Sequence, residues 1–272
     1  MIIGACLAAE FERVFSVGTE PCSLEHLETV AGKFALIPYE NLSKIVRAAR
    51  EMDPGKRLRM PMDILREFVE LGAGGTCFSL TYCMQMVLEA YGYRCAPRMA
   101  DLGRSANNHC ALIVVFDDRE YLLDPGYLIT RPLPLPETGF AVHETRLHPV
   151  RLERDTGGGL HLVTLEPDGP KHRYHLHATD CDRETFRQYW IDSFSWNMMH
   201  SLLFTRMTGE GRMYLHDRHI RWMDRSGRRS DTIREDYDRQ VAAHTGIAFD
   251  LVEQARSIVG DVKAVLPRKR SS

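Results

Sequence analysis

Long apolar runs, close cysteine pairs and a strong net charge are all missing from this sequence of 272 residues. No uninterrupted apolar stretch approaches the roughly 18 residues that a membrane-spanning helix requires. The first nine residues are mildly apolar, but they lack a cationic segment and run directly into acidic residues, unlike a secretory signal. These absences predict a soluble, cytoplasmic protein without a membrane partner.

The cysteines and the charge exclude further classes of protein. Seven cysteines form an odd set without a CxxC pair: Cys6, Cys22, Cys77, Cys83, Cys95, Cys110 and Cys181. Such a set argues against a disulfide framework and against a zinc knuckle, so we expect mostly reduced thiols in apolar surroundings. The formal net charge of -2 provides no broad basic surface, and we expect no nucleic-acid partner.

The sequence does contain enough apolar material for a real core. Its hydrophobic share is 44%, which is ordinary for a globular protein, and its length allows one large domain or about two to three small ones. Neither an internal repeat nor a low-complexity tract interrupts it. The coarse order is helices to about residue 92, then β-strands, then a mixed α/β segment.

The first third of the chain has helical patterning. Residues 23–30 predict a helix with Ser23 as its N-cap, and apolar positions recur with helical spacing across residues 62–69. Residues 77–91 are apolar nearly all round the helix, and Gly92 is a natural stop. We therefore expect this last helix to be central and buried.

Strand patterns dominate the middle of the chain. Residues 110–116 and 121–124 predict a β-hairpin whose turn is residues 117–118. Further short strands are expected over residues 160–165 and 172–177. The remaining elements expected are a helix over residues 183–197, a strand-turn-strand pattern through residues 208–211 and 225–227, and a final helix beginning near Asp231.

Residues 72–80, GAGGTCFSL, place a cysteine at the start of the buried helix. There the thiol of Cys77 meets unpaired backbone N–H groups and the positive end of the helix dipole, which favour the thiolate. Gly74 and Gly75 permit a tight turn, and exposed N–H groups there could hold an oxyanion. The alternative interpretation is a small buried hydrophobic residue. Two residues further along the chain favour the catalytic interpretation.

These two residues are a histidine and an aspartate at the predicted hairpin. His109 lies just before the first strand, and Asp124 lies at the end of the second. With residues 117–118 as the turn, Asp124 falls opposite Ala111, two positions from His109 on the same face. A slip of one residue would separate them onto opposite faces. In the expected register, Cys77, His109 and Asp124 form a nucleophile, a base and a group that orients the base.

Short motifs surround these three residues. Residues 73–77 read AGGTC, His109 opens a strand, residues 124–127 read DPGY and residues 37–42 read IPYENL. They resemble the Arg-Gly-Gly-X-Cys, strand-opening histidine, Asp-Val-Gly-Phe and Ile-Pro-Phe-Glu-Asn-Leu motifs of the arylamine N-acetyltransferases. Looser matches continue to residue 247, so the resemblance covers nearly the whole chain.

The resemblance implies an α+β fold with a papain-like cysteine-enzyme core. A helical N-terminal domain, residues 1–92, would carry the nucleophile. A β-barrel domain, residues 93–192, would carry the histidine and the aspartate, and an α/β lid, residues 193–272, would complete the fold. The implied activity is acyl transfer, most simply acetyl transfer, from a thioester to an amine with ping-pong kinetics.

The resemblance also implies roles for single residues. Cys77 would take the acyl group, His109 would act as base and then deliver a proton, and Asp124 would hold the imidazole. The residues expected to bind substrate or the oxyanion are Gly75, Thr76, Phe78, Gly126 and Tyr127. The co-substrates would be a small-molecule amine and acetyl-CoA or another acyl thioester, without a permanently bound cofactor.

The chain departs from the family at three positions near the cysteine. Ala73 replaces the arginine, and Ser79 and Thr81 stand where glutamate and asparagine are usual. Because loss of a buried cation can strand its acidic partner, Glu40 must find another donor or lie in water. Three alternatives stay open: an amide synthase that uses an acyl carrier protein or another thioester donor, a thioesterase, transglutaminase-like enzyme or peptidase, and a non-catalytic binding protein.

A histidine-rich stretch invites a metal interpretation. His172, His175 and His177 are close in sequence, but only His175 and His177 share a strand face. Because no cysteine or acidic set nearby completes four ligands, we expect no metal site. The glycines at residues 157–159 are interpreted as a loop, since no Lys-Ser/Thr follows them.

Overall fold

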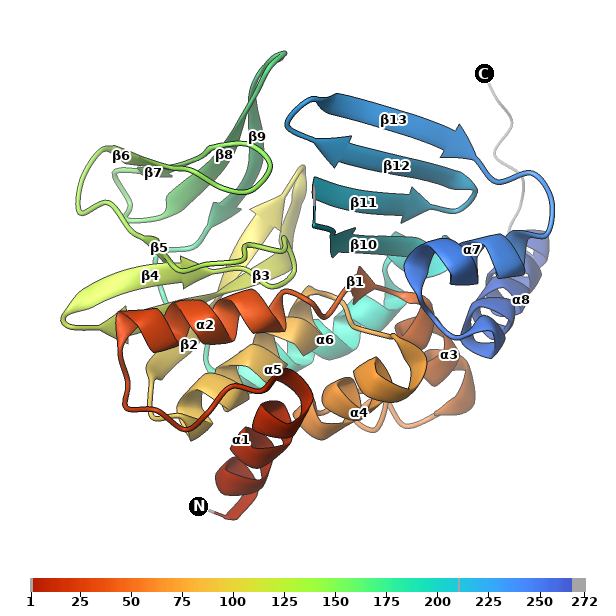
Figure 1. The fold of residues 1–272 in the computed structure, drawn as a ribbon, viewed down its shortest axis with the longest axis horizontal. Helices are drawn as coiled ribbons and strands as arrows, with labels where there is room; N and C mark the ends of the chain where they lie inside the picture. Colours follow the sequence, from red (N-terminus) through yellow and green to blue (C-terminus); the bar gives the residue numbers. More distant parts are fainter. Residues whose placement is uncertain (1, 210, 266–272) are drawn as a thin grey trace.

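Most helices in the N-terminal third of the chain share one buried apolar cluster with a central helix, α5 (Cys77–Ala90) (Figure 1). The structure is a computed structural model and describes residues 2–209 and 211–265. The helices of this part are α1 (Ile2–Phe15), α2 (Leu24–Phe34), α3 (Leu42–Arg50), α4 (Pro61–Leu71) and α5 (Cys77–Ala90). The Ser23 side chain caps α2 by accepting a hydrogen bond from the His26 N–H at 3.0 Å, as predicted. Helix α5 is buried, also as predicted.

An eight-stranded antiparallel sheet curls into a nearly closed barrel beside these helices (Figure 1). Its strands are β2 (Arg94–Leu102), β3 (Ser105–Phe116), β4 (Arg119–Leu123), β5 (Leu133–Pro134), β6 (Phe140–His143), β7 (Val150–Arg154), β8 (Leu160–Glu166) and β9 (Gly169–Leu176). Their spatial order is β5-β4-β3-β2-β9-β8-β7-β6. Apolar side chains from several of these strands form one buried cluster.

The β3–β4 hairpin has the register expected from the sequence. Phe116 pairs with Arg119, and the ladder continues to Leu112 opposite Leu123. Residues 117–118 both have positive φ values, 47° and 56°, as a tight hairpin turn of this kind requires. One detail is wrong: β3 begins at Ser105, because the preceding strand pairs with it that far. His109 therefore lies inside the strand rather than before it.

A second sheet and two helices form the C-terminal part (Figure 1). The sheet has the order β1-β10-β11-β12-β13. The elements are β1 (Tyr39–Glu40), α6 (Arg183–Asp192), β10 (Leu203–Met207), β11 (Gly211–His216), β12 (His219–Asp224), β13 (Gly227–Thr232), α7 (Tyr237–Thr245) and α8 (Phe249–Val265). Because β1 comes from the helical region yet pairs with β10, this strand joins the two parts.

Two helix boundaries differ from the sequence predictions. The helix expected over residues 183–197 ends at Asp192 and continues as two short 3-10 turns. The helix expected from Asp231 begins only at Tyr237, because residues 227–232 pair with β12 as an edge strand. A strand was expected after the turn at residues 225–227, but every residue of β13 is exposed, so its sequence carries no alternation to mark where the strand ends. Glu210, in the predicted β10–β11 turn, lies outside the described residues.

The C-terminal sheet presents two different faces. Met213, Leu215 and Ile220 are buried in one cluster with apolar residues of α7 and α8. Arg212 and Tyr214 alternate with the buried residues along β11 and so face the opposite side. No helix among the described residues is both long and apolar enough to cross a membrane. The sheet thus carries a polar face that is free to line a cleft.

Candidate active site

The loop before Cys77 is held by a backbone pairing with the start of β1. The Gly75 N–H donates to the Pro38 carbonyl at 3.2 Å, and the Glu40 N–H donates to the Gly75 carbonyl at 2.9 Å. A Cβ atom at Gly74 would lie 1.7 Å from the Pro38 oxygen, so only glycine fits there. This close pairing fixes where α5 begins and therefore where the Cys77 sulfur lies.

The same contacts correct one expectation. The Gly74 N–H donates to Glu40 Oε1 at 3.1 Å, and the Gly75 N–H is taken by Pro38. The prediction that these groups are exposed and could hold an oxyanion is therefore wrong. The N–H groups in the first turn of α5, which a helix leaves without intrahelical partners, are the donors that remain beside Cys77.

His109 and Asp124 meet as the hairpin register requires. His109 Nε2 lies 2.8 Å from Asp124 Oδ2, and the Asp124 side chain is completely buried. Asp124 Oδ1 accepts a hydrogen bond from the Tyr127 N–H at 2.8 Å, which fixes the carboxylate. The Tyr174 ring packs against the imidazole with 4.8 Å between ring centroids. Because Asp124 occupies Nε2, the ring nitrogen left for the thiol of Cys77 is Nδ1.

Gly126 brings the histidine and the cysteine together. A Cβ atom at this position would lie 2.8 Å from Cys77 Cβ and 3.1 Å from His109 Cε1. Any side chain there would push the two apart. The site therefore requires glycine at 126 for close approach rather than for an unusual backbone angle.

Electrostatics in the site favour an ion pair of thiolate and imidazolium. The pKa of Cys77 is well below its usual value. A hydrogen bond with the Cys110 thiol lowers it most, and the neighbouring His109 lowers it further, whereas burial opposes both. Burial alone would lower the pKa of His109, but Asp124 and Cys77 outweigh it and raise that pKa to about 10. Between these limits the sulfur is negative and the ring is positive, which is the activated form of a cysteine nucleophile.

Two residues that the sequence analysis did not place at the site, Cys110 and Lys44, act on the Cys77 sulfur, the first through a hydrogen bond and the second through its charge. Burial raises the pKa of Cys110 well above its usual value, so this thiol stays protonated and can donate to Cys77. Burial lowers the pKa of Lys44 to about 8. Its Nζ donates to the Ser193 carbonyl at 3.0 Å and hydroxyl at 2.6 Å. No local sequence pattern signals either residue, because both reach Cys77 only through packing.

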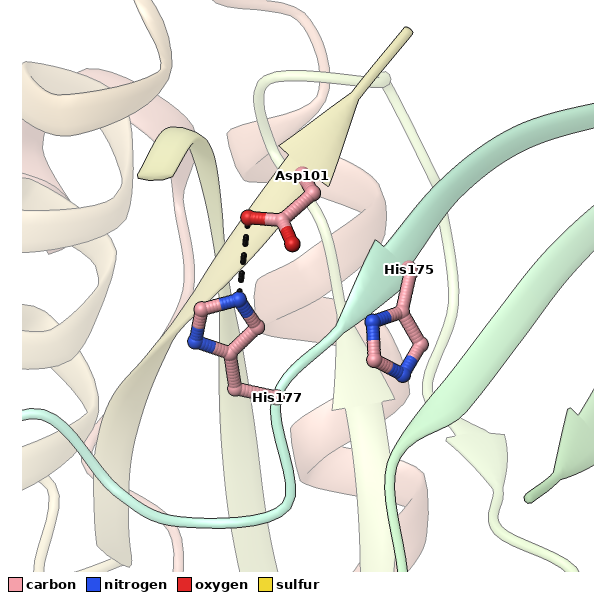
Figure 2. A group of neighbouring side chains, drawn as sticks. All are labelled: Asp101, His175 and His177. Carbon is pink, nitrogen blue, oxygen red and sulfur yellow. Dashed lines mark hydrogen bonds and ion pairs between the residues drawn. The ribbon is translucent and has the colours of Figure 1, made fainter. Parts of the chain in front are cut away.

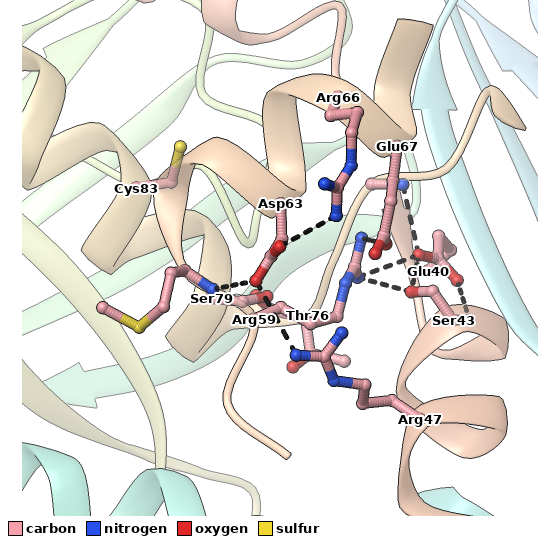
Figure 3. A network of polar contacts seen from close by, with 12 residues as sticks. Glu40, Ser43, Arg47, Arg59, Asp63, Arg66, Glu67, Thr76, Ser79 and Cys83 are labelled. Carbon is pink, nitrogen blue, oxygen red and sulfur yellow. Dashed lines mark hydrogen bonds and ion pairs between the residues drawn. The ribbon is translucent and has the colours of Figure 1, made fainter. Parts of the chain in front are cut away.

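The buried Glu40 carboxylate has found a replacement cation. Arg59 Nη1 lies 3.5 Å from Glu40 Oε1, and the Arg59 side chain is only 4% exposed (Figure 3). Arg59 also pairs with Glu67 and hydrogen-bonds to Ser43, whose N–H donates to Glu40 Oε2 at 2.9 Å. Arg59, from the segment before α4, thus supplies the positive charge that Ala73 lacks.

A cavity of about 790 Å³ opens over the sulfur. Of the residues expected to bind substrate, Gly126 and Tyr127 line it together with Cys77 and His109. The other three, Gly75, Thr76 and Phe78, are not among its lining residues. Trp196, Arg212 and Tyr214 also line it, and these residues were not predicted because they are distant in sequence from Cys77.

The sequence analysis expected no metal site because it found no acidic set near the histidines, and this reason is wrong. Acidic side chains do lie beside the histidines: Asp155 Oδ2 is 2.7 Å from His175 Nε2, and Asp101 Oδ1 is 2.9 Å from His177 Nε2. Asp101 comes from β2 and Asp155 from the β7–β8 turn, so sequence proximity could not show them. None of these four residues lines the cavity over Cys77.

Comparisons with known proteins identify a family and a shared fold. The N-acetyltransferase family profile matches residues 23–257. No curated protein sequence was found to match the chain. The structure is similar to that of Mycobacterium marinum arylamine N-acetyltransferase in complex with CoA, with a TM-score of 0.79 and 21% identity over 94% of this chain and 99% of that one.

Two further solved structures share the fold. The arylamine N-acetyltransferase of Salmonella typhimurium has a TM-score of 0.78 and 16% identity, covering 94% of this chain and 98% of its own. The Bacillus cereus enzyme, which has a Cys-His-Glu catalytic triad, has a TM-score of 0.72 and 16% identity, covering 89% and 98%. The similarity in fold thus extends over nearly the full length of each protein.

Proposed function

The chain belongs to the arylamine N-acetyltransferase family. From this premise we propose that it moves an acyl group, most simply acetyl, from a thioester to a small-molecule amine. The acyl group would be carried by an acyl-cysteine at Cys77. One observation carries the proposal. A buried cysteine with a lowered pKa lies at a cavity beside His109, and Asp124 holds that imidazole at 2.8 Å. This is the arrangement that activates a sulfur nucleophile.

In the first half-reaction the Cys77 thiolate attacks the carbonyl carbon of the thioester. The C–S bond of the donor breaks, and the leaving thiolate takes a proton from the His109 imidazolium. N–H groups in the first turn of α5 are assigned to the oxyanion that forms on the way. Since one thioester replaces another, the step costs little free energy.

In the second half-reaction the amine nitrogen attacks the acyl-cysteine. His109, now neutral, accepts the amine proton at Nδ1, while Asp124 holds the other ring nitrogen and fixes the tautomer. The C–S bond to Cys77 breaks, which releases the amide and restores the thiolate and imidazolium. Donor and acceptor therefore use one site in turn, and ping-pong kinetics follow.

A basic groove favours a phosphate-bearing donor such as acetyl-CoA. A second cavity, of about 710 Å³, shares Arg173, Arg212 and Tyr214 with the cavity over Cys77. The further basic residues that line it are Lys171, Arg221, Arg225 and Arg228, and they outnumber the acidic ones, Glu166, Asp168 and Asp224. The Nε atoms of Arg212 and Arg221 are buried and make no hydrogen bond within the described residues. The guanidinium groups of the arginines that line this groove are suited to pair with a phosphate, and the Mycobacterium marinum relative was solved with CoA.

The primary test is trapping of the acyl-enzyme by intact mass. We expect acetyl-CoA to add one acetyl group to the chain, and an added arylamine to remove it. Cys77→Ser should prevent the adduct, whereas Cys83→Ser, on the same helix, should keep it. Absence of an adduct would contradict the proposal. Discharge by water as fast as by any amine would identify a thioesterase instead.

The donor site is tested with two acetyl thioesters, one that carries the phosphates of CoA and a short one that does not. Arg212→Gln and Arg221→Gln should each raise KM for acetyl-CoA about tenfold, the cost of one charge-assisted hydrogen bond. S-acetyl-N-acetylcysteamine, which lacks the phosphates, should be used equally by both variants and the parent. If the variants used both donors equally poorly, the arginines would not act by binding the phosphates. Preference for a carrier-protein thioester would identify an amide synthase.

A further inference from the structure

The barrel carries a row of potential metal ligands on the face opposite the catalytic histidine. His175 of β9 pairs with His161 of β8 on one side and with Asp101 of β2 on the other. Asp155 adds a carboxylate from the turn between β7 and β8. Neighbouring Tyr174 faces the barrel interior and packs on His109, so His175, one residue further on, points to the outer face.

Asp155 is prepared to act as a ligand. Its Oδ1 accepts hydrogen bonds from the N–H groups of Gly157 at 2.7 Å and Gly159 at 2.9 Å. This leaves Oδ2 facing His175 Nε2 at 2.7 Å and His161 Nε2 at 3.9 Å. Two imidazole nitrogens and one fixed carboxylate oxygen thus converge.

The surroundings hold these three side chains in place. His161 Nδ1 lies 3.0 Å from His172 Nε2, so His172 orients the ring and leaves Nε2 of His161 available. A Cβ atom at Gly159 would lie 2.4 Å from His175 Nε2 and 2.7 Å from Asp155 Oδ2. Only glycine at this position lets the carboxylate and the imidazole meet.

We propose that Asp155, His161 and His175 bind one divalent transition-metal ion, with solvent completing its coordination. The three ligand atoms lie within 4.8 Å of one another. Ligands about 2.1 Å from a tetrahedral ion are roughly 3.4 Å apart, a spacing that half-exposed side chains reach by small rotations. Because two donors are imidazoles, Zn²⁺, Ni²⁺ and Cu²⁺ suit the site, whereas Mg²⁺ and Ca²⁺, which prefer oxygen, do not.

A second set of residues provides the control. Asp101 and His177 lie on the other side of His175 (Figure 2). In this second set, the carboxylate oxygen that faces the histidine already has two partners. Asp101 Oδ1 lies 2.9 Å from His177 Nε2 and accepts a hydrogen bond from the Asn107 N–H at 2.8 Å. His177 is about as exposed as His175, 33% against 32% for the side chains. His177→Gln therefore removes an equivalent histidine without touching the proposed ligands.

The test is calorimetric titration of the untagged chain with Zn²⁺, with Co²⁺ absorption as a second readout of ligand geometry. The Cys77→Ala background removes the reactive thiolate, which could itself bind zinc. We expect one ion per chain. His161→Gln, His175→Gln and Asp155→Asn should each raise Kd at least about tenfold. His177→Gln should leave Kd within about twofold, as a residue outside the ligand set.

Several results would overturn the proposal. One is an absence of Zn²⁺ binding on the Cys77→Ala background. Another is equal binding by every histidine variant, which would assign the metal to other thiols. A loss with His177→Gln but not with His161→Gln would move the ion to the neighbouring set. Melting temperatures measured without metal establish that each variant is folded.

Discussion

The same contact between an imidazole and a carboxylate occurs in two parts of the barrel. His109 Nε2 lies 2.8 Å from Asp124, and His175 Nε2 lies 2.7 Å from Asp155. Their surroundings differ: the buried pair has side-chain exposures of 8% and 0%, whereas the outer pair has 32% and 28%. Distance alone therefore does not distinguish the two pairs, but solvent access does.

The difference shows what burial adds to a hydrogen bond. Away from water, the Asp124 charge keeps the His109 imidazole positive, and that positive ring, together with the Cys110 hydrogen bond, favours the thiolate of Cys77. At the half-exposed pair, water screens the charges, and no nucleophile is among the described residues that contact His175. The buried pair is suited to proton transfer, and the outer pair is suited to binding an ion.

The largest expected effect is on the rate of Cys77 acylation when the buried carboxylate charge, and not the outer one, is removed. Asp124→Asn should slow acylation of Cys77 about 10³ to 10⁴-fold, because the imidazole loses the group that fixes its tautomer and stabilises its charge. Asp155→Asn is the matched change in the outer pair and should leave acylation unchanged. Single-turnover acylation by acetyl-CoA measures both. Similar losses in the two variants would mean that the pairs do not differ in function.

A second comparison sets the buried ion pair of Arg59 with Glu40 against the exposed ion pair of Arg66 with Asp63. Arg59→Met should lower the free energy of unfolding by about 3–5 kcal/mol, because it leaves the buried Glu40 without its cation. Arg66→Met breaks the exposed pair with Asp63 and should cost no more than about 1 kcal/mol. Urea unfolding measures both values. A small loss for Arg59→Met would show that Glu40 does not depend on this cation.

The smallest expected effect is on thiol reactivity. Only the thiolate reacts with iodoacetamide, so the alkylation rate rises with pH through the pKa of Cys77. Since that pKa is lowered, the rate should stay near its maximum at neutral pH and fall only in acid. His109→Gln removes the neighbouring positive charge, so it should raise the pKa of Cys77 and slow alkylation at neutral pH by about tenfold or more.

The outer histidine provides the control for this measurement. His175→Gln should leave the pH profile of Cys77 alkylation unchanged, because His175 is on the other face of its strand from Tyr174, which packs on His109. A Cys77 that reacts no faster than an ordinary thiol at neutral pH would contradict the assigned ion pair and support the non-catalytic alternative.

Local sequence patterns predicted the hairpin and the two site residues on it. The positions of His109 and Asp124 followed from the turn at residues 117–118, because side chains alternate faces with a period of two once a turn fixes the register. The start of α5 at Cys77 followed from its glycines and the apolar run. The strand expected after the turn at residues 225–227 is present as β13, but its end was misplaced, since a strand exposed on both faces has no such alternation to mark it.

By itself, the sequence determined the residue types of the site, the family and the order of its helices and strands, because these depend on neighbours along the chain. Tertiary structure alone decided that Cys77 lies beside Cys110, that Arg59 replaces the missing arginine, and that Asp101 and Asp155 reach the barrel histidines. Each of these contacts joins segments far apart in the chain. They form only when strands and helices pack, and packing is set by the whole core rather than by any one stretch of residues.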